Sequence, residues 1–148
     1  MTRLLKSPRV VGFFLFLPTV VILIIASVLE PDPSGMGTHQ QLGLSPCSFW
    51  LWFTIPCPMC GMTTTFSYMA NVDILNAMRT QPFGVVLFLA TLILMGIGFW
   101  DMVFGKKVHQ SVFRWVFRYE AFFFRLLSCG FFIGWLYKLW AVGALGGE

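Results

Sequence analysis

Charged residues are scarce in this sequence of 148 residues. Asp, Glu, Lys and Arg make up 11% of it, against about 25% in an ordinary soluble domain. Hydrophobic residues make up 57%, above the roughly 45–50% of such domains. This balance excludes a free-standing soluble globule, and it leaves no room for a separate soluble enzyme. No element typical of nucleic-acid binding is visible, so we expect no nucleic-acid partner.

Long apolar runs take the place of the missing charge. Residues 10–28 carry no charged side chain, and at about 1.5 Å per residue they nearly cover a hydrocarbon core of about 30 Å. Residues 83–104 and 121–142 form two further runs of sufficient length. We therefore predict an all-α integral membrane protein, a single membrane domain over residues 1–148 with three transmembrane helices.

The connections between the spans predict two interfacial amphipathic helices. Residues 47–80 form a re-entrant or interfacial region, because the aromatic segment 47–56 is too short to span. Apolar residues then recur at three-to-four spacing from Gly61 to Arg79, which indicates one amphipathic helix. The connection 105–118 repeats this pattern with a basic face, which suits anionic lipid headgroups.

Basic residues alternate along the chain in a way that predicts its orientation. The N-terminal tail, the segment 29–82 and the connection 105–118 hold three, one and four of them. Since cytoplasmic segments carry the excess of Lys and Arg, the N-terminus should be cytoplasmic and the C-terminus outside. In chain order the residues counted are Arg3, Lys6 and Arg9, then Arg79, then Lys106, Lys107, Arg114 and Arg118.

The run Cys57-Pro58-Met59-Cys60-Gly61 is the motif that carries chemistry. Two thiols at this spacing point into one turn, where they can close a disulfide or bind one metal ion. Gly61 can adopt a positive φ after the turn. If a helix begins there, its dipole favours the thiolate of Cys60.

Several states of this thiol pair are open. Two reduced, buried, structural thiols are the state we favour, followed by a disulfide and then by a metal site. A metal site needs further ligands, for which Cys47, His39 or a second copy of the chain are candidates. Cys129 is expected to be buried inside the third span. An outward-facing redox site fits an oxidising compartment, although no thioredoxin-like pattern accompanies the pair.

The segment from Cys57 into the second span resembles a family of small bacterial membrane proteins, known as domain-of-unknown-function family 2752. The resemblance implies a bacterial cytoplasmic (inner) membrane location and supports a surface helix before the second span. It implies no reaction. The matching residues are Cys57, Pro58, Cys60, Gly61, Thr63, Asp73 and Pro82. Thr64, Val72 and Gln81 stand where the family pattern has Arg, Gly and Asn. The missing Arg takes away a cation beside the thiols.

Two charges fall inside predicted spans. Asp101 near the end of the second span and Arg125 near the start of the third should lie at similar depth, so we predict that they pair. Lys138 lies near the outer end of the third span, where we expect its side chain to extend to the interface.

Together these features predict a non-catalytic membrane subunit without a cofactor. We expect it to pack against a larger membrane-protein complex or a second copy of itself, because aromatic residues crowd the segment 47–56 and the third span. The alternative is an outward-facing thiol-disulfide oxidoreductase or metal-binding protein that uses Cys57 and Cys60.

Overall fold

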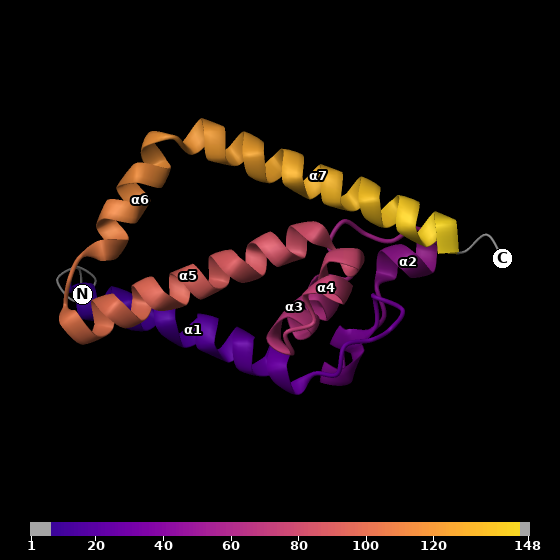
Figure 1. Cartoon of the computed structure of the whole chain (residues 1–148), viewed down its shortest axis with the longest axis horizontal. Coiled ribbons are helices and arrows are strands. Elements are labelled where there is room, and N and C mark those ends of the chain that lie inside the picture. Colours follow the sequence, from indigo (N-terminus) through magenta and orange to yellow (C-terminus); the bar gives the residue numbers. More distant parts are fainter. Residues whose placement is uncertain (1–6, 146–148) are drawn as a thin grey trace. The chain divides into compact units, whose positions relative to one another are not determined.

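The computed structural model describes residues 7–145, which form seven α-helices and one short 3-10 helix. Three helices are long and apolar enough to cross a membrane, which confirms the prediction of an all-helical protein with three spans (Figure 1). Arg3 and Lys6, two of the residues behind the predicted orientation, lie outside the described range. The long helices are α1 (Pro8–Val28), α5 (Pro82–Phe104) and α7 (Glu120–Leu145).

The chain divides into two compact units. The first unit comprises residues up to Ile24 and Leu89–Leu126, and the second comprises Ile25–Phe88 and Leu127 onward. Each unit draws on parts of all three long helices. All four cysteines of the chain belong to the second unit.

In the first unit, α1 and α5 approach each other closely at two glycines. A Cβ atom on Gly12 would lie 2.5 Å from the backbone nitrogen of Met102. A Cβ atom on Gly98 would lie 2.7 Å from the backbone nitrogen of Phe16. Small residues at a crossing let two helix backbones touch, a frequent device of membrane helices.

Asp101 of the first unit joins the end of α5 to the start of α6 (Val108–Arg118). Its carboxylate accepts hydrogen bonds from the backbone nitrogens of Val108 (2.9 Å) and His109 (3.0 Å), and it pairs with Nδ1 of His109. Gly105 turns the chain back with φ +62°, so the unpaired N–H groups that begin α6 meet this carboxylate. Within residues 7–145, the ion pair of Asp101 is with His109. The predicted pairing with Arg125 is therefore wrong, and the Arg125 side chain is exposed.

The second unit holds a 3-10 helix, η2 (Thr38–Leu42), and three short helices, α2 (Ser48–Phe53), α3 (Met62–Ala70) and α4 (Ile74–Thr80). The single amphipathic helix predicted from Gly61 to Arg79 is thus wrong, because the chain breaks between α3 and α4. Val72 adopts a left-handed φ of +61° at the break. Asp73 then caps α4 by accepting a hydrogen bond from the backbone nitrogen of Asn76 (3.2 Å). The two helices lie side by side (Figure 1).

Hydroxyl groups hold the interior of the second unit together. Thr38 of η2 donates a hydrogen bond to Oγ1 of Thr64 on α3 (2.9 Å), and both side chains are buried. Ser67, also on α3, donates to the backbone oxygen of Leu29. These bonds fasten the loop after α1 to α3, and they satisfy polar groups that are costly to bury alone.

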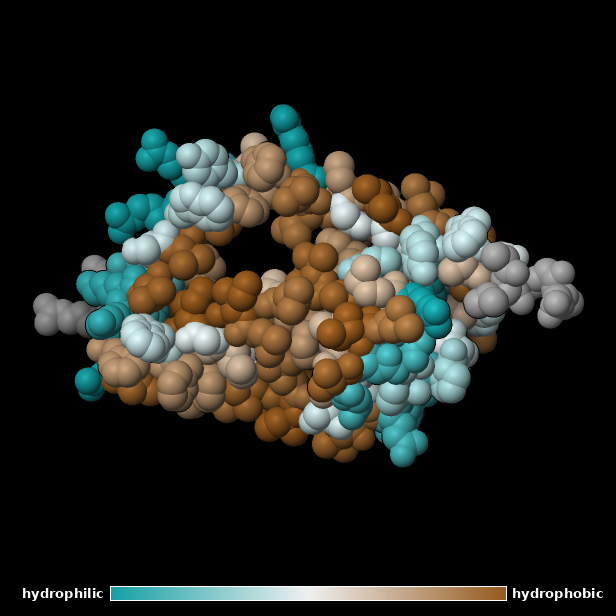
Figure 2. Space-filling view, viewed as in Figure 1, coloured by the Kyte–Doolittle hydropathy of each residue, from teal (hydrophilic) through white to brown (hydrophobic). Residues whose placement is uncertain are grey.

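Apolar side chains are exposed along the long helices. Phe14 on α1, Ile93 on α5 and Phe124 on α7 each expose more than 60% of their surface. Apolar residues cover much of the visible face in Figure 2. Such exposure is unfavourable in water and favourable in a hydrocarbon environment, which fits a multi-pass membrane protein.

Candidate functional site

The Cys57–Gly61 segment forms a tight turn before α3. The backbone nitrogen of Cys60 donates to the oxygen of Cys57 (2.9 Å), and Gly61 follows with φ +89°, as the sequence predicted. A Cβ atom on Gly61 would lie 2.8 Å from the backbone oxygen of Gly35 and 3.2 Å from Nζ of Lys138. Glycine is required here both for its backbone conformation and for its small size.

Three thiols converge at this turn. The sulfurs of Cys57 and Cys60 are 3.2 Å apart. Cys47, the N-cap residue of α2, brings a third sulfur to them, and all three lie within 4.8 Å of one another. All four cysteines are free thiols, and Cys129 is exposed on α7 rather than buried as predicted. We call Cys47, Cys57 and Cys60 the thiol cluster.

The acidities of the clustered thiols differ strongly. Burial acts to raise the pKa of Cys47, but hydrogen bonds from the backbone of Trp50 and from the other two thiols outweigh it and lower the pKa to about 7. Burial raises the pKa of Cys60 to about 12, and the neighbouring thiols add to this effect. The predicted thiolate preference of Cys60 is therefore wrong, because desolvation outweighs the helix N-terminus.

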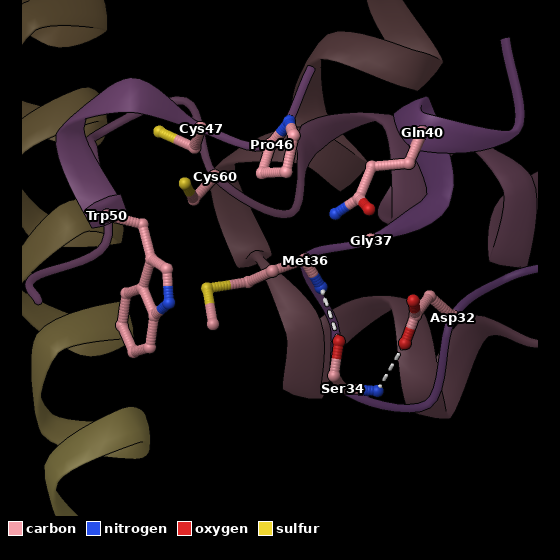
Figure 3. Close-up of a pocket in the computed structure, with 9 residues that line it drawn as sticks. All are labelled: Asp32, Ser34, Met36, Gly37, Gln40, Pro46, Cys47, Trp50 and Cys60. Atoms are coloured by element: carbon pink, nitrogen blue, oxygen red, sulfur yellow. Dashed lines mark hydrogen bonds between the residues drawn. The ribbon is translucent and has the colours of Figure 1, made fainter. Parts of the chain in front are cut away.

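Two pockets open beside the thiol cluster. One, of about 290 Å³, is lined by Cys47 and Cys60 together with Met36 and Trp50. In Figure 3 the sulfurs of these two cysteines lie near each other, and the Met36 thioether is turned toward the Trp50 ring. The other, of about 340 Å³, is lined by all three cysteines and by His39. The cluster is thus reachable from outside the protein, and His39 shares its pocket.

Side chains from distant elements hold the cysteine turn in place. Trp135 on α7 donates its ring N–H to the backbone oxygen of Pro56 (3.0 Å). Gln81, fully buried between α4 and α5, donates to the backbone oxygen of Pro58 (3.4 Å). The backbone of Gln81 is extended, as a residue before proline requires, and this directs the chain into α5.

Lys138 on α7 supplies a cation beneath the cysteine turn. Its side chain is 4% exposed, and Nζ donates to the backbone oxygens of Gly35 (3.1 Å) and Thr80 (3.4 Å). The expectation that it extends to the membrane interface is wrong, because the loop at Gly35 and the C-terminal end of α4 bind its ammonium in a buried position. The sequence signal was a lysine inside a span, a position that calls for a buried partner.

The other motif residues have local structural roles. Thr63 lines the pocket that contains all three cysteines. Asp73 caps α4, and Pro82 is the first residue of α5, where a missing N–H does no harm. Thr64 stands where the family pattern has Arg and bonds to Thr38 instead.

The fold and the site define a helical membrane protein with three clustered thiols beside its spans. Residues 47–95 match the family described as "Protein of unknown function (DUF2752)", which is the family that the cysteine motif resembles. The matched segment includes all three clustered cysteines and ends within α5. No curated protein and no solved structure matches the chain.

Proposed function

We propose that this protein binds a thiophilic metal ion through Cys47, Cys57 and Cys60. The observation that carries the proposal is the convergence of three sulfurs within 4.8 Å of one another. Thiolates are soft ligands, which favour ions such as Zn²⁺ over Mg²⁺ or Ca²⁺. Metal binding is one of the two activities that the cysteine motif predicts.

The spacing of the sulfurs suits a single ion. Metal–sulfur bonds of about 2.3 Å in a tetrahedral site place neighbouring sulfurs about 3.8 Å apart. The sulfurs of Cys57 and Cys60, which are 3.2 Å apart, are slightly closer than this value. No two of the three sulfurs are more than 4.8 Å apart.

The third cysteine favours metal binding over disulfide chemistry. A two-cysteine redox motif needs only Cys57 and Cys60. Cys47 comes from a separate segment, as the N-cap residue of α2, and its sulfur lies within 4.8 Å of the other two. His39 in the adjoining pocket offers a nitrogen ligand for the fourth position.

Cobalt binding to the reduced full-length protein in detergent tests this proposal. Co²⁺ bound by thiolates absorbs in the near ultraviolet, and Zn²⁺ added afterwards should displace it. We expect one ion per chain in the wild type and weaker absorption in Cys47→Ser, Cys57→Ser and Cys60→Ser. Cys129→Ser is the matched control, because that thiol is exposed and outside the cluster. Absence of metal from the wild type, with rapid formation of a Cys57–Cys60 disulfide instead, overturns metal binding in favour of thiol-disulfide exchange.

We also propose that the thiol cluster faces outward from a bacterial cytoplasmic membrane. The support is the alternation of basic residues, of which Arg9, Arg79 and those of 105–118 lie within the described chain. A membrane-impermeant thiol reagent should label a cysteine introduced at Gln40 in intact cells and leave one introduced at Lys107 unlabelled. Labelling at position 107 from outside contradicts this orientation.

A second candidate function is that of a subunit packing against a larger membrane-protein complex. Helix α2 supports it, since none of its residues is buried and Trp52 exposes 83% of its surface. Exposed aromatic clusters are enriched at interface centres. Native mass measurement after gentle solubilisation should find a further chain or copy bound, and Trp52→Ser should release it. A lone monomer in every mild detergent removes this second candidate.

A further inference from the structure

We infer that Lys138 is the counter-charge of a divalent metal–thiolate centre in the second unit. The inference rests on the proposed metal binding and adds a residue that lies far from the cysteine motif in sequence. Lys138 acts as a positioning residue, because its ammonium binds the backbone around the cluster.

The position of Lys138 is the first observation. Its Nζ lies 3.2 Å from the place of a Cβ on Gly61, the residue directly after Cys60. Gly61 follows Cys60, the buried cysteine of the cluster, so the ammonium lies against the backbone next to that thiol. A positive charge thus stands directly behind the cysteine turn.

The surroundings of Lys138 are the second observation. The backbone oxygens of Gly35 and Thr80 accept its hydrogen bonds, and both are neutral. Within residues 7–145, no carboxylate lies within ion-pairing distance of this ammonium. A buried charge without an opposite charge is unfavourable, so the ammonium calls for an anionic partner. The metal–thiolate centre proposed beside it provides one.

Charge balance then selects the kind of ion. Three thiolates with one divalent ion carry a net charge of minus one, which the Lys138 ammonium cancels. A poorly solvated site favours a set of groups whose charges sum to zero, as those of the ion, the three thiolates and the ammonium do. We therefore assign the centre to a divalent thiophilic ion of the Zn²⁺ class.

The test separates the charge of Lys138 from its hydrogen bonds. Lys138→Gln keeps a donor but removes the charge, whereas Lys138→Arg keeps the charge. Zn²⁺ affinity is measured on each full-length variant in detergent, by competition with a chelator, and Co²⁺ spectra at saturation report whether three thiolates still bind. Arg125→Gln, which removes an exposed cation from the same helix, is the matched control.

We expect Lys138→Gln to weaken Zn²⁺ binding at least about tenfold, since one unit charge at close range in a partly buried site is worth that or more. Its saturated Co²⁺ spectrum should match the wild type, and Lys138→Arg should bind close to wild-type strength. Wild-type affinity in Lys138→Gln overturns the inference while the metal site stands. Equal weakening in both variants, with unchanged spectra, also overturns it, because the charge is then not the cause. Failure of the wild type to bind any metal refutes the proposed function itself.

Discussion

The two units each bury one charged residue of a span, and they do so in opposite ways. Asp101 in the first unit bonds to residues seven and eight positions further along the chain. Lys138 in the second unit bonds to residues 58 and 103 positions earlier. The first arrangement needs only one turn and the start of one helix. The second exists only when loops and helices from most of the chain have assembled.

The thiol cluster therefore belongs to the unit whose buried charge depends on long-range contacts. In the first unit, the cap of α6 joins near neighbours in the sequence, whereas the glycine crossing joins α1 to the distant α5. The second gathers three thiols, a lysine, a tryptophan and a glutamine from separate segments around one turn. Perturbing the second unit should therefore affect distant residues, whereas perturbing the first should remain local.

The largest expected effect concerns the reactivity of the thiols in the second unit. At pH 8 in the absence of metal, iodoacetamide should modify Cys47 more than about a hundredfold faster than Cys60, because the thiolate is the nucleophile. Cys47 reactivity should rise through pH 7, following its lowered pKa, while Cys60 stays protonated. Peptide mass spectrometry of timed reactions measures both rates. Equal rates for the two residues contradict the buried environment of Cys60.

Removing the long-range cation should loosen the second unit. Lys138→Met leaves two buried backbone oxygens without their donor, and we expect a loss of about 2–4 kcal/mol in local stability. Cys60 should then become reactive toward maleimide. Hydrogen exchange of α6 should stay unchanged, since that helix belongs to the first unit. Faster exchange in α6 would remove the distinction between the units.

The matching change in the first unit should remain local. Asp101→Ala removes the acceptor for the start of α6, which should cost about 1–2 kcal/mol. Amide exchange at Val108 and His109 should accelerate, while the alkylation rates of the thiol cluster stay at wild-type values. Glu120→Ala, at an exposed acidic residue, serves as the control. Altered thiol reactivity in Asp101→Ala shows that this site is not local.

The smallest expected effect is a gain in stability at the break between α3 and α4. Val72 is a β-branched residue with φ +61°, a conformation that costs non-glycine residues about 1–2 kcal/mol. Val72→Gly should relieve this strain and raise the thermal midpoint. The gain should be small, because glycine has a larger conformational entropy in the unfolded state. Val72→Ala is the control and should gain less. A lower midpoint in Val72→Gly contradicts the strain.

The sequence predicts the spans well because hydropathy and length are local properties. The cysteine turn follows in the same way from Pro58 and Gly61. The break at Val72 was missed because valine gives no turn signal, although the family pattern has glycine there. The burial of Lys138 and the arrival of Cys47 depend on contacts between distant segments, which neither periodicity nor motif spacing encodes. The predicted Asp101–Arg125 pair is wrong because Gly105 turns the chain back, and His109 at the start of α6 then binds the carboxylate.

The glycine crossing of the first unit sets how its two spans respond to membrane thickness. A Cβ atom on Gly12 would lie 2.7 Å from the backbone oxygen of Gly98, and a Cβ atom on Gly98 would lie 3.0 Å from the backbone oxygen of Gly12. Such an approach allows weak Cα–H···O contacts, for which lipid does not compete. Sliding one helix along the other would bring larger side chains into the crossing. In a thinner bilayer these segments of α1 and α5 should therefore tilt together and keep their relative depth.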